Sequence, residues 1–237
     1  MGYGFYYGLF DPTMILVLIG VLISAAASAA VNGTFQKYAR VRSYCGMTGA
    51  QVAERLLNFQ GIYDVAVRQV PGNLTDHYDP RTKTLNLSQT VYGSTSVAAL
   101  GVAAHECGHA IQDARNYVPL KLRGAFVPVA NLGAQLSVPL IIIGVILGYG
   151  GHFLVQLGIW MFVLVVAFQV ITLPVEFNAS ARAIRLLGDT GILSDQENSG
   201  AKKVLGAAAM TYVASVLASL LQLLRLVILF GGRRRDE

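Results

Sequence analysis

The chain has 237 residues, of which 54% are hydrophobic and 13% are charged, and its mean hydropathy is +0.53. These values exclude an ordinary soluble domain and favour an integral membrane protein with a modest polar part. The net charge is +5, but the basic residues are scattered near apolar segments and form no stripe with aromatic residues, so we expect no nucleic-acid partner.

The first predicted element is a transmembrane helix at residues 12–31, because this apolar run is long enough to cross a hydrocarbon core of about 30 Å. The charged residue before the run is Asp11, and three basic residues follow it: Lys37, Arg40 and Arg42. The positive-inside bias therefore places the N-terminus outside and the next segment in the cytoplasm. We interpret residues 1–42 as an N-terminal transmembrane anchor.

Residues 43–123 have the composition of a polar, cytoplasmic domain that combines helices and strands. Thr48 and Gln51 form a capping-box pattern, which predicts a helix that continues to Leu57. Alternating apolar and polar residues predict short strands. These strands cover residues 64–70, 77–78 and 85–87, and the last two are joined around residues 79–81. A further helix, capped at residues 94–96, is predicted to continue to Arg115.

The apolar block at residues 126–173 is predicted to form a transmembrane helical hairpin, within a segment bounded by residues 124 and 174. The block is too long for one span, and a glycine-rich run at residues 148–152 interrupts it. One helix is therefore expected to end near Leu147 and the next to begin at Phe153. Lys and Arg residues lie on both outer flanks of the hairpin and none lies in its turn, so the turn is expected outside the cell.

The C-terminal part of the chain is interpreted as a helix and loop at residues 175–203, followed by an apolar helix and basic tail at residues 204–237. A complete span here would carry Arg233–Arg235 to the outside, against the positive-inside bias. Arg225, inside the apolar stretch, is costly unless it faces protein or reaches the interface. The sequence thus predicts a mainly α integral membrane protein with three to four transmembrane helices, and leaves open whether the last helix spans fully.

The predicted helix before Arg115 carries the motif His105-Glu106-Cys107-Gly108-His109, which has the H-E-x-x-H form. Residues four apart lie one above the other on a helix, so His105 and His109 can present two imidazole nitrogens to one ion. Glu106 lies about 100° around the helix from His105, close enough to reach a water on that ion. This is the arrangement of a metalloprotease. Cys107 points away from the histidine face and is not counted as a ligand.

A catalytic zinc ion usually takes three protein ligands and keeps the fourth position for water, so a third ligand is needed. The candidates are Glu176, His77, His152 and the aspartates of the polar domain. Glu176 is favoured because it begins a helical segment at the cytoplasmic end of a predicted span, where an ionised carboxylate is otherwise awkward. The alternative is an interfacial glutamate that simply faces water.

Three motifs together resemble those of the bacterial YugP-like neutral zinc metallopeptidases. They are residues 104–112 (Ala-His-Glu-Cys-Gly-His-Ala-Ile-Gln), residues 76–81 (Asp-His-Tyr-Asp-Pro-Arg) and residues 176–180 (Glu-Phe-Asn-Ala-Ser). The resemblance covers nearly the whole chain. That family is in turn similar to the HtpX-like and CAAX-prenyl membrane proteases, which pair H-E-x-x-H with a later E-x-x-A-D.

The resemblance implies a gluzincin-like α+β metalloprotease domain, with the H-E-x-x-H helix and a small β-sheet. It also implies one Zn²⁺ ion bound by His105, His109 and Glu176, with Glu106 as the general base. The related membrane proteases have Asp four residues after the ligand Glu, where this chain has Ser180. A serine can accept an imidazole N–H, but its neutral hydroxyl raises ligand basicity less than a carboxylate does. Asp113, four residues after His109, is a possible substitute.

The expected reaction is attack of a zinc-activated water on a peptide carbonyl, with Glu106 taking the proton and passing it to the leaving amine. Candidates for a second oxyanion donor, or for substrate binding, are His77, Tyr78 and Arg182. The strand at residues 85–87 is either an ordinary sheet strand or an edge to which an extended substrate could add.

The sequence therefore predicts a membrane-anchored zinc metallopeptidase that hydrolyses protein or peptide substrates at or near the cytoplasmic face of the bacterial cytoplasmic membrane. One alternative is an intramembrane-cleaving protease, but the apolar run before His105 covers only residues 97–104, too short to hold the motif at mid-membrane depth. The other is a non-catalytic zinc-binding membrane scaffold, which the presence of Glu106 argues against. The lipid bilayer and a protein substrate are the expected partners.

Overall fold

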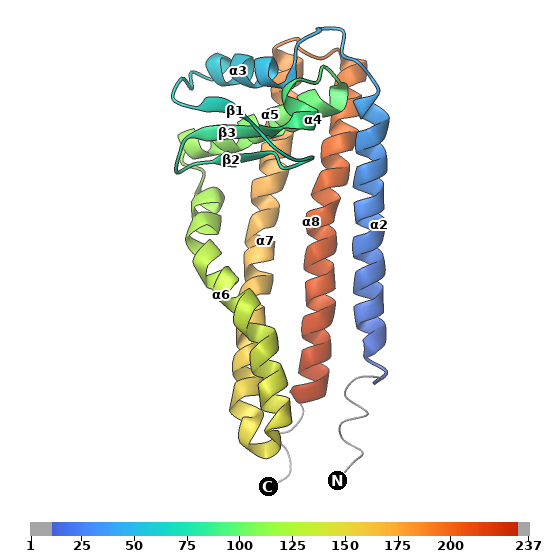
Figure 1. The fold of residues 1–237 in the computed structure, drawn as a ribbon, viewed down its shortest axis with the longest axis vertical. Coiled ribbons are helices and arrows are strands. Elements are labelled where there is room, and N and C mark those ends of the chain that lie inside the picture. Colours follow the sequence, from blue (N-terminus) through green and yellow to red (C-terminus); the bar gives the residue numbers. More distant parts are fainter. Residues whose placement is uncertain (1–10, 232–237) are drawn as a thin grey trace. The chain divides into compact units, whose positions relative to one another are not determined.

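The computed structural model describes residues 11–231, in two compact units that are treated separately below (Figure 1). The helical unit comprises Met1–Ala27, Leu122–Ile171 and Tyr212–Glu237, and the α/β unit comprises Ser28–Lys121 and Thr172–Thr211. The basic run Arg233–Arg235 and the first ten residues lie outside the described part of the chain.

The α/β unit contains three short strands, as the sequence predicts, and they form one mixed sheet. Its elements between residues 49 and 114, in chain order, are α3 (Gly49–Phe59), β1 (Ala66–Val70), β2 (His77–Asp79), β3 (Thr84–Ser88), α4 (Gln89–Tyr92) and α5 (Val97–Ala114). The strand order is β1-β3-β2, with β1 parallel and β2 antiparallel to β3. The suggestion that residues 85–87 form a sheet edge is wrong, because β3 is the central strand and its backbone pairs on both sides.

Local capping determines where the two main helices of this unit begin. Thr48 and Gln51 form a reciprocal capping box at the start of α3, and the Ser96 hydroxyl accepts a hydrogen bond from the Ala99 amide at the start of α5. Both caps satisfy amide groups that the first helical turn leaves without partners. Both helix starts predicted from the sequence are confirmed.

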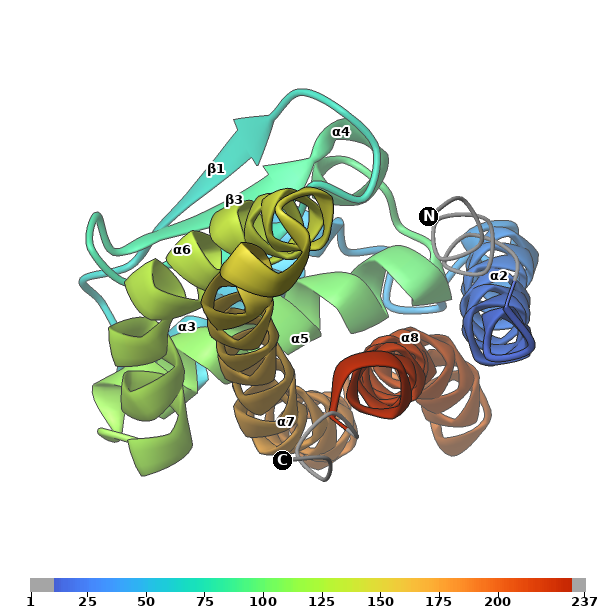
Figure 2. The same ribbon diagram turned by 90° about the horizontal axis from the view of Figure 1, so that it is seen from below.

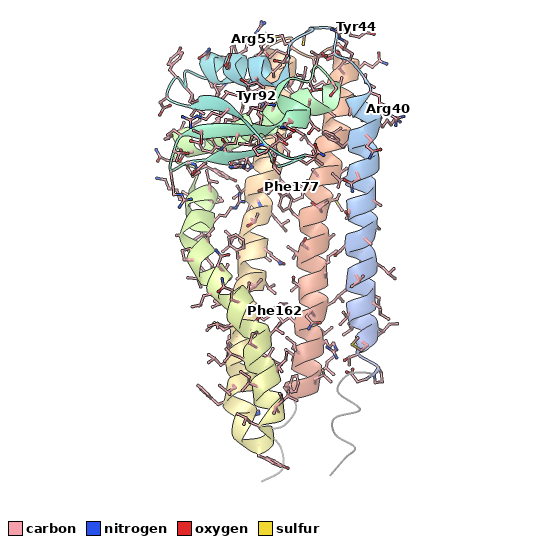
Figure 3. All side chains as sticks on the ribbon, in the orientation of Figure 1. Arg40, Tyr44, Arg55, Tyr92, Phe162 and Phe177 are labelled. Atoms are coloured by element: carbon pink, nitrogen blue, oxygen red, sulfur yellow. The ribbon has the colours of Figure 1, made fainter. Side chains whose placement is uncertain are left out.

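The core of the α/β unit forms around α5, which is buried along nearly its whole length. The largest fully buried apolar side chains include Leu56 and Leu57 of α3, Leu85 and Leu87 of β3, and Leu100 and Ile111 of α5. Tyr92 of α4, labelled in Figure 3, packs against this core. Burial on all faces holds α5 in a fixed orientation, so the side chains that it presents to neighbouring elements are well placed.

Within residues 11–231, four helices are long and apolar enough to cross a membrane. They are α2 (Met14–Ala39), α6 (Val118–Ile146), α7 (His152–Asp189, preceded by the short helix η1 at Gly148–Gly151) and α8 (Asp195–Phe230). The turn between α6 and α7 falls at the predicted glycine-rich run, where Gly148 has a φ of +62° that a side chain would strain.

Two helices are longer than the sequence predicts. Helix α7 continues through Pro174 and Glu176 to Asp189, although we expected the hairpin to end at residue 174 and a separate helix to follow. Helix α8 begins at Asp195 and continues to Phe230, so the last apolar stretch and the residues before it form one helix. Pro174 lies inside α7, where a proline removes one backbone N–H and bends the helix without having to end it.

Within the helical unit, α6 and α7 lie side by side (Figure 2). A small apolar cluster links them to α8. The cluster is centred on Val155, Ile159 and Leu226. Arg225 of α8, which the sequence marked as costly, forms an ion pair with Asp11 at 3.1 Å. Many large apolar side chains of these helices are exposed, among them Leu22, Ile142 and Phe153, as is typical of surfaces that contact lipid.

Candidate metal centre

Helix α5 places His105 and His109 one above the other, as the four-residue spacing predicts. The two imidazole rings have centroids 4.8 Å apart and are nearly perpendicular, with an interplanar angle of 85°. Glu106 lies between them in sequence and is 7% exposed, and His109 is 9% exposed. The motif is therefore set in a largely buried part of the α/β unit.

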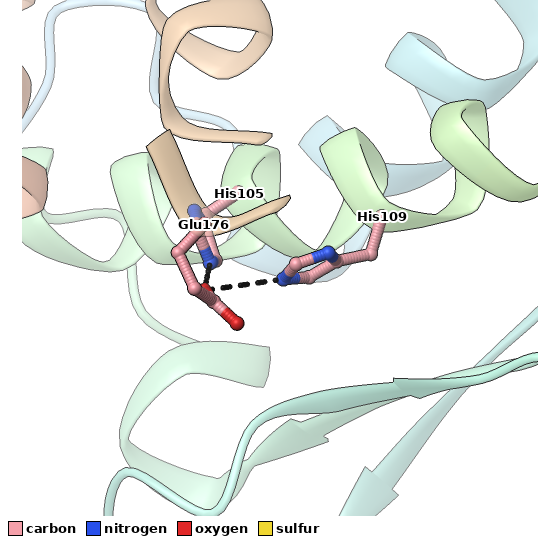
Figure 4. A group of neighbouring side chains, drawn as sticks. All are labelled: His105, His109 and Glu176. Carbon is pink, nitrogen blue, oxygen red and sulfur yellow. Dashed lines mark ion pairs between the residues drawn. The ribbon is translucent and has the colours of Figure 1, made fainter. Parts of the chain in front are cut away.

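Helix α7 places Glu176 beside the two histidines, although it lies 67 residues after His109 in the sequence (Figure 4). The Glu176 Oε2 atom is 3.2 Å from His105 Nε2 and 3.5 Å from His109 Nε2. One ligand atom from each of the three residues lies within 4.8 Å of the other two. Glu176 is also buried, with 2% exposure, so its carboxylate is held in place by the surrounding fold.

The distances among these three atoms fit a zinc ion. A tetrahedral zinc with bonds of about 2.0–2.1 Å separates its ligand atoms by roughly 3.3 Å, close to the 3.2 and 3.5 Å between Glu176 and the imidazoles. Two imidazoles and one carboxylate are the ligands of catalytic zinc sites, which keep a position for water, whereas structural sites are usually closed by four Cys or His ligands. The three residues can therefore hold a catalytic zinc.

The other ring nitrogen of each histidine also has a partner. The Ser180 hydroxyl lies 3.1 Å from His105 Nδ1, and the Gln112 side-chain carbonyl lies 3.0 Å from His109 Nδ1. Partners at Nδ1 fix the ring orientation and leave Nε2 free to bind a metal. Ser180 was expected from the sequence as a partner of a ligand histidine, but Gln112 was not. The sequence feature that points to Gln112 is its place three residues after His109, on the same face of the helix.

The pKa of His109 depends on its burial and on two neighbouring acidic groups. Burial lowers the pKa of His109, but a hydrogen bond with Glu176 and the negative charge of Glu106 outweigh burial, so the pKa is raised above its ordinary value. Cys107 is fully buried on another face of α5, where its thiol donates to the Ala53 carbonyl at 3.6 Å. Burial raises the pKa of Cys107, which keeps the thiol protonated and disfavours its use as a ligand.

Asp113 has partners other than the imidazoles. Its Oδ2 atom accepts hydrogen bonds from the Tyr78 hydroxyl at 2.8 Å and from Lys83 Nζ at 2.7 Å. Burial and the neighbouring Asp113 carboxylate raise the pKa of Tyr78, so this phenol stays protonated across the neutral range. Tyr78 was a candidate oxyanion donor or substrate contact, and Asp113 was a candidate partner of a ligand histidine. The structure shows the two side chains hydrogen-bonded to each other.

The remaining candidates lie in different surroundings. His77 is exposed on β2 and contacts the Thr75 carbonyl and the Asn86 amide, at 2.9 and 3.1 Å. Arg182 donates from Nε to the Asn178 side chain at 2.7 Å. His152 is the first residue of α7 and belongs to the helical unit, whereas the group of possible metal ligands in the described residues is formed by His105, His109 and Glu176 of the α/β unit.

The sequence is similar to those of known proteins over most of its length. Residues 13–231 match a protein family described as "Putative neutral zinc metallopeptidase". A relative from Bacillus subtilis (strain 168), described as "Putative membrane protease YugP", is 44% identical over 222 residues, which cover 94% of this chain and 98% of the relative. No solved structure matches the chain.

Proposed function

Since the chain belongs to the family of YugP-like neutral zinc metallopeptidases, we propose that it is a membrane-anchored zinc endopeptidase with a gluzincin-like catalytic domain. It hydrolyses protein or peptide substrates at or near the cytoplasmic face of the bacterial membrane. The observation that carries the proposal is the convergence of His105, His109 and Glu176, in a geometry that fits one zinc ion with a position left for water.

In this proposal His105, His109 and Glu176 hold the metal, and Glu106 acts on the attacking water. A bound zinc would lower the pKa of that water and polarise the scissile carbonyl. Glu106 takes the proton from the water and returns it to the leaving amine. Its low exposure supports this role, because few solvent molecules can compete with the attacking water for the carboxylate.

An extended substrate can bind along β2, which is an outer strand of the described sheet and contacts α5. The free backbone groups of an outer strand pair with an added peptide strand, which holds the peptide in an extended conformation. Tyr78 on β2 is held by Asp113, so its hydroxyl reaches a substrate oxygen only if that hydrogen bond is exchanged. His77 and Arg182 stay candidates for substrate contacts.

The distribution of basic residues supports a cytoplasmic position for the α/β unit. The helical unit has two described basic residues, Arg123 and Arg225. More basic residues lie in the α/β unit near the ends of the candidate spans, among them Arg40, Lys121 and Arg182. Cytoplasmic flanks of membrane helices are enriched in Lys and Arg. Helix α5 is not among the four candidate spans, which favours cleavage near the membrane surface over cleavage within the bilayer.

The deciding experiment replaces Glu106 with Gln in the full-length protein and measures cleavage of an unfolded test protein together with zinc content. We expect cleavage to fall by at least about 100-fold while zinc is retained, because Gln keeps the size of Glu but cannot accept the proton. Glu54→Gln, at an exposed position of α3, is the matched control. Full cleavage by Glu106→Gln would exclude the mechanism, and zinc-loaded wild-type protein without any cleavage would favour a scaffold.

A further inference from the structure

Gln112 is a fully buried polar side chain in the middle of the α/β unit. It lies on α5, three residues after His109, and its exposure is 0%. Glutamine is rarely buried completely, because its amide loses hydrogen bonds to water and must replace them with others.

Gln112 has three polar contacts, and they join two helices. Its carbonyl Oε1 accepts from His109 Nδ1 at 3.0 Å, within α5. Its Nε2 donates to the Val175 backbone carbonyl at 2.8 Å and to Asn178 Oδ1 at 3.1 Å, both on α7. A glutamine amide has two N–H groups and one carbonyl, so these contacts use both donors and the acceptor.

Each contact bears on a proposed zinc ligand. The Gln112 carbonyl holds a proton of His109 on Nδ1, so that Nε2, 3.5 Å from Glu176 Oε2, is the ring nitrogen available to a metal. Val175 directly precedes Glu176, and Asn178 follows it by two residues. One side chain thus orients a histidine ligand and holds the backbone next to the carboxylate ligand.

Helix α7 also contacts His105, because the Ser180 hydroxyl lies next to His105 Nδ1. Both imidazoles are therefore oriented by contacts that lead to α7, directly for His105 and through Gln112 for His109. The Asn178 oxygen that receives the Gln112 amide also accepts from Arg182 Nε at 2.7 Å, so the amide of Asn178 is itself oriented. These contacts continue from the buried histidine to the half-buried Arg182.

We propose that Gln112 is a positioning residue that sets the affinity of the site for zinc, by coupling the orientation of His109 to the position of Glu176. This inference rests on the proposed zinc site. The alternative is that Gln112 only joins two helices and stabilises the fold. The two roles differ in one measurable respect, since a residue that only joins helices would not alter the coordination geometry of a metal bound to the folded protein.

The experiment uses full-length protein in detergent, with Gln112→Met as the main variant. Methionine has nearly the same length as glutamine and makes none of its hydrogen bonds. The measurements are the zinc dissociation constant, from competition with a chelator, and the visible absorption of the Co²⁺-substituted protein. We expect zinc affinity to fall by about 10–100-fold and the Co²⁺ absorption to shift. Gln89→Met, at an exposed position of α4, is the matched control.

A Gln112→Met protein that folds, binds zinc within twofold of wild type and keeps the wild-type Co²⁺ absorption would overturn the inference. If this variant does not fold, Asn178→Ala decides the question, because it removes one Gln112 contact and leaves both histidines intact. We expect it to weaken zinc binding at least twofold, and wild-type affinity would overturn the inference. Failure of wild-type protein to bind zinc at all would instead refute the proposed function.

Discussion

Gly108 lies directly against the backbone of Ala179, where helices α5 and α7 approach each other. A Cβ atom placed on Gly108 would be 2.6 Å from the Ala179 carbonyl oxygen and 3.0 Å from its Cα. Backbone atoms cannot yield as a flexible side chain can, so no residue with a side chain fits here without moving a helix. Gly108 directly precedes His109, and Ala179 is three residues after Glu176, so this approach brings the proposed ligands together.

The first prediction concerns Gly108→Ala. We expect the added methyl group to push α5 and α7 apart, to lower the free energy of unfolding by about 1–3 kcal/mol and to weaken zinc binding. Chemical denaturation of the metal-free protein and chelator competition measure the two effects. Gly206→Ala on α8 is the control, since its Cβ would meet nothing within 4 Å and alanine favours a helix. Equal behaviour of the two variants would show that this close approach is not needed.

The parts of the site that could be predicted from the sequence depend on local spacing. The histidine pair follows from the helical repeat, and the caps at Thr48 and Ser96 depend on residues within one turn. Glu176 could be favoured because a carboxylate beside an apolar run needs an explanation. Each of these signals is present in a short stretch of sequence.

The parts that could not be predicted depend on contacts between distant segments. Gln112 donates to residues 63 and 66 positions further along the chain, and a buried glutamine in a helix has the same sequence pattern as an exposed one. The central place of β3 depends on its pairing with β1, which periodicity does not encode. The partner of Arg225 lies 214 residues away, at Asp11.

The second prediction concerns the carboxylate ligand. Glu176→Gln keeps the side-chain volume and removes the negative oxygen that lies near both imidazoles. We expect zinc affinity to fall by at least about 100-fold, which is more than the loss expected when a residue that only contacts a ligand is replaced. The measurement is zinc content after dialysis against a zinc buffer, with Glu54→Gln as the control. Normal zinc content in Glu176→Gln would assign the third ligand to another residue.

The third prediction uses the hydroxyl that contacts His105. Ser180→Ala removes the partner of His105 Nδ1 and is expected to weaken zinc binding about 10-fold, whereas Ser180→Asp places a carboxylate there and is expected to strengthen binding. The opposite directions of the two changes distinguish ligand orientation from general destabilisation, which would weaken both variants. Chelator competition measures the order, and equal zinc affinity in all three proteins would remove Ser180 from the site.

The fourth prediction concerns the ion pair between Asp11 and Arg225 in the helical unit. Arg225 lies in an apolar helix, where an unpaired charge is costly, and its side chain is 13% exposed. The Asp11 carboxylate also accepts hydrogen bonds from the amide and hydroxyl of Thr13, just before α2 begins. Asp11→Asn keeps an acceptor for Thr13 and removes the charge that compensates Arg225. We therefore expect its unfolding temperature in detergent to fall by about 5 °C or more.

A second substitution tests whether the charge pair causes that loss. In Asp11→Asn/Arg225→Leu neither charge remains, so we expect the double variant to recover most of the unfolding temperature lost in Asp11→Asn, as happens when both members of a buried pair are replaced. The interaction energy from the four proteins of this cycle measures the coupling of the two residues. Additive losses would mean that the two side chains stabilise the unit independently, for example through the Thr13 contacts of Asp11 alone.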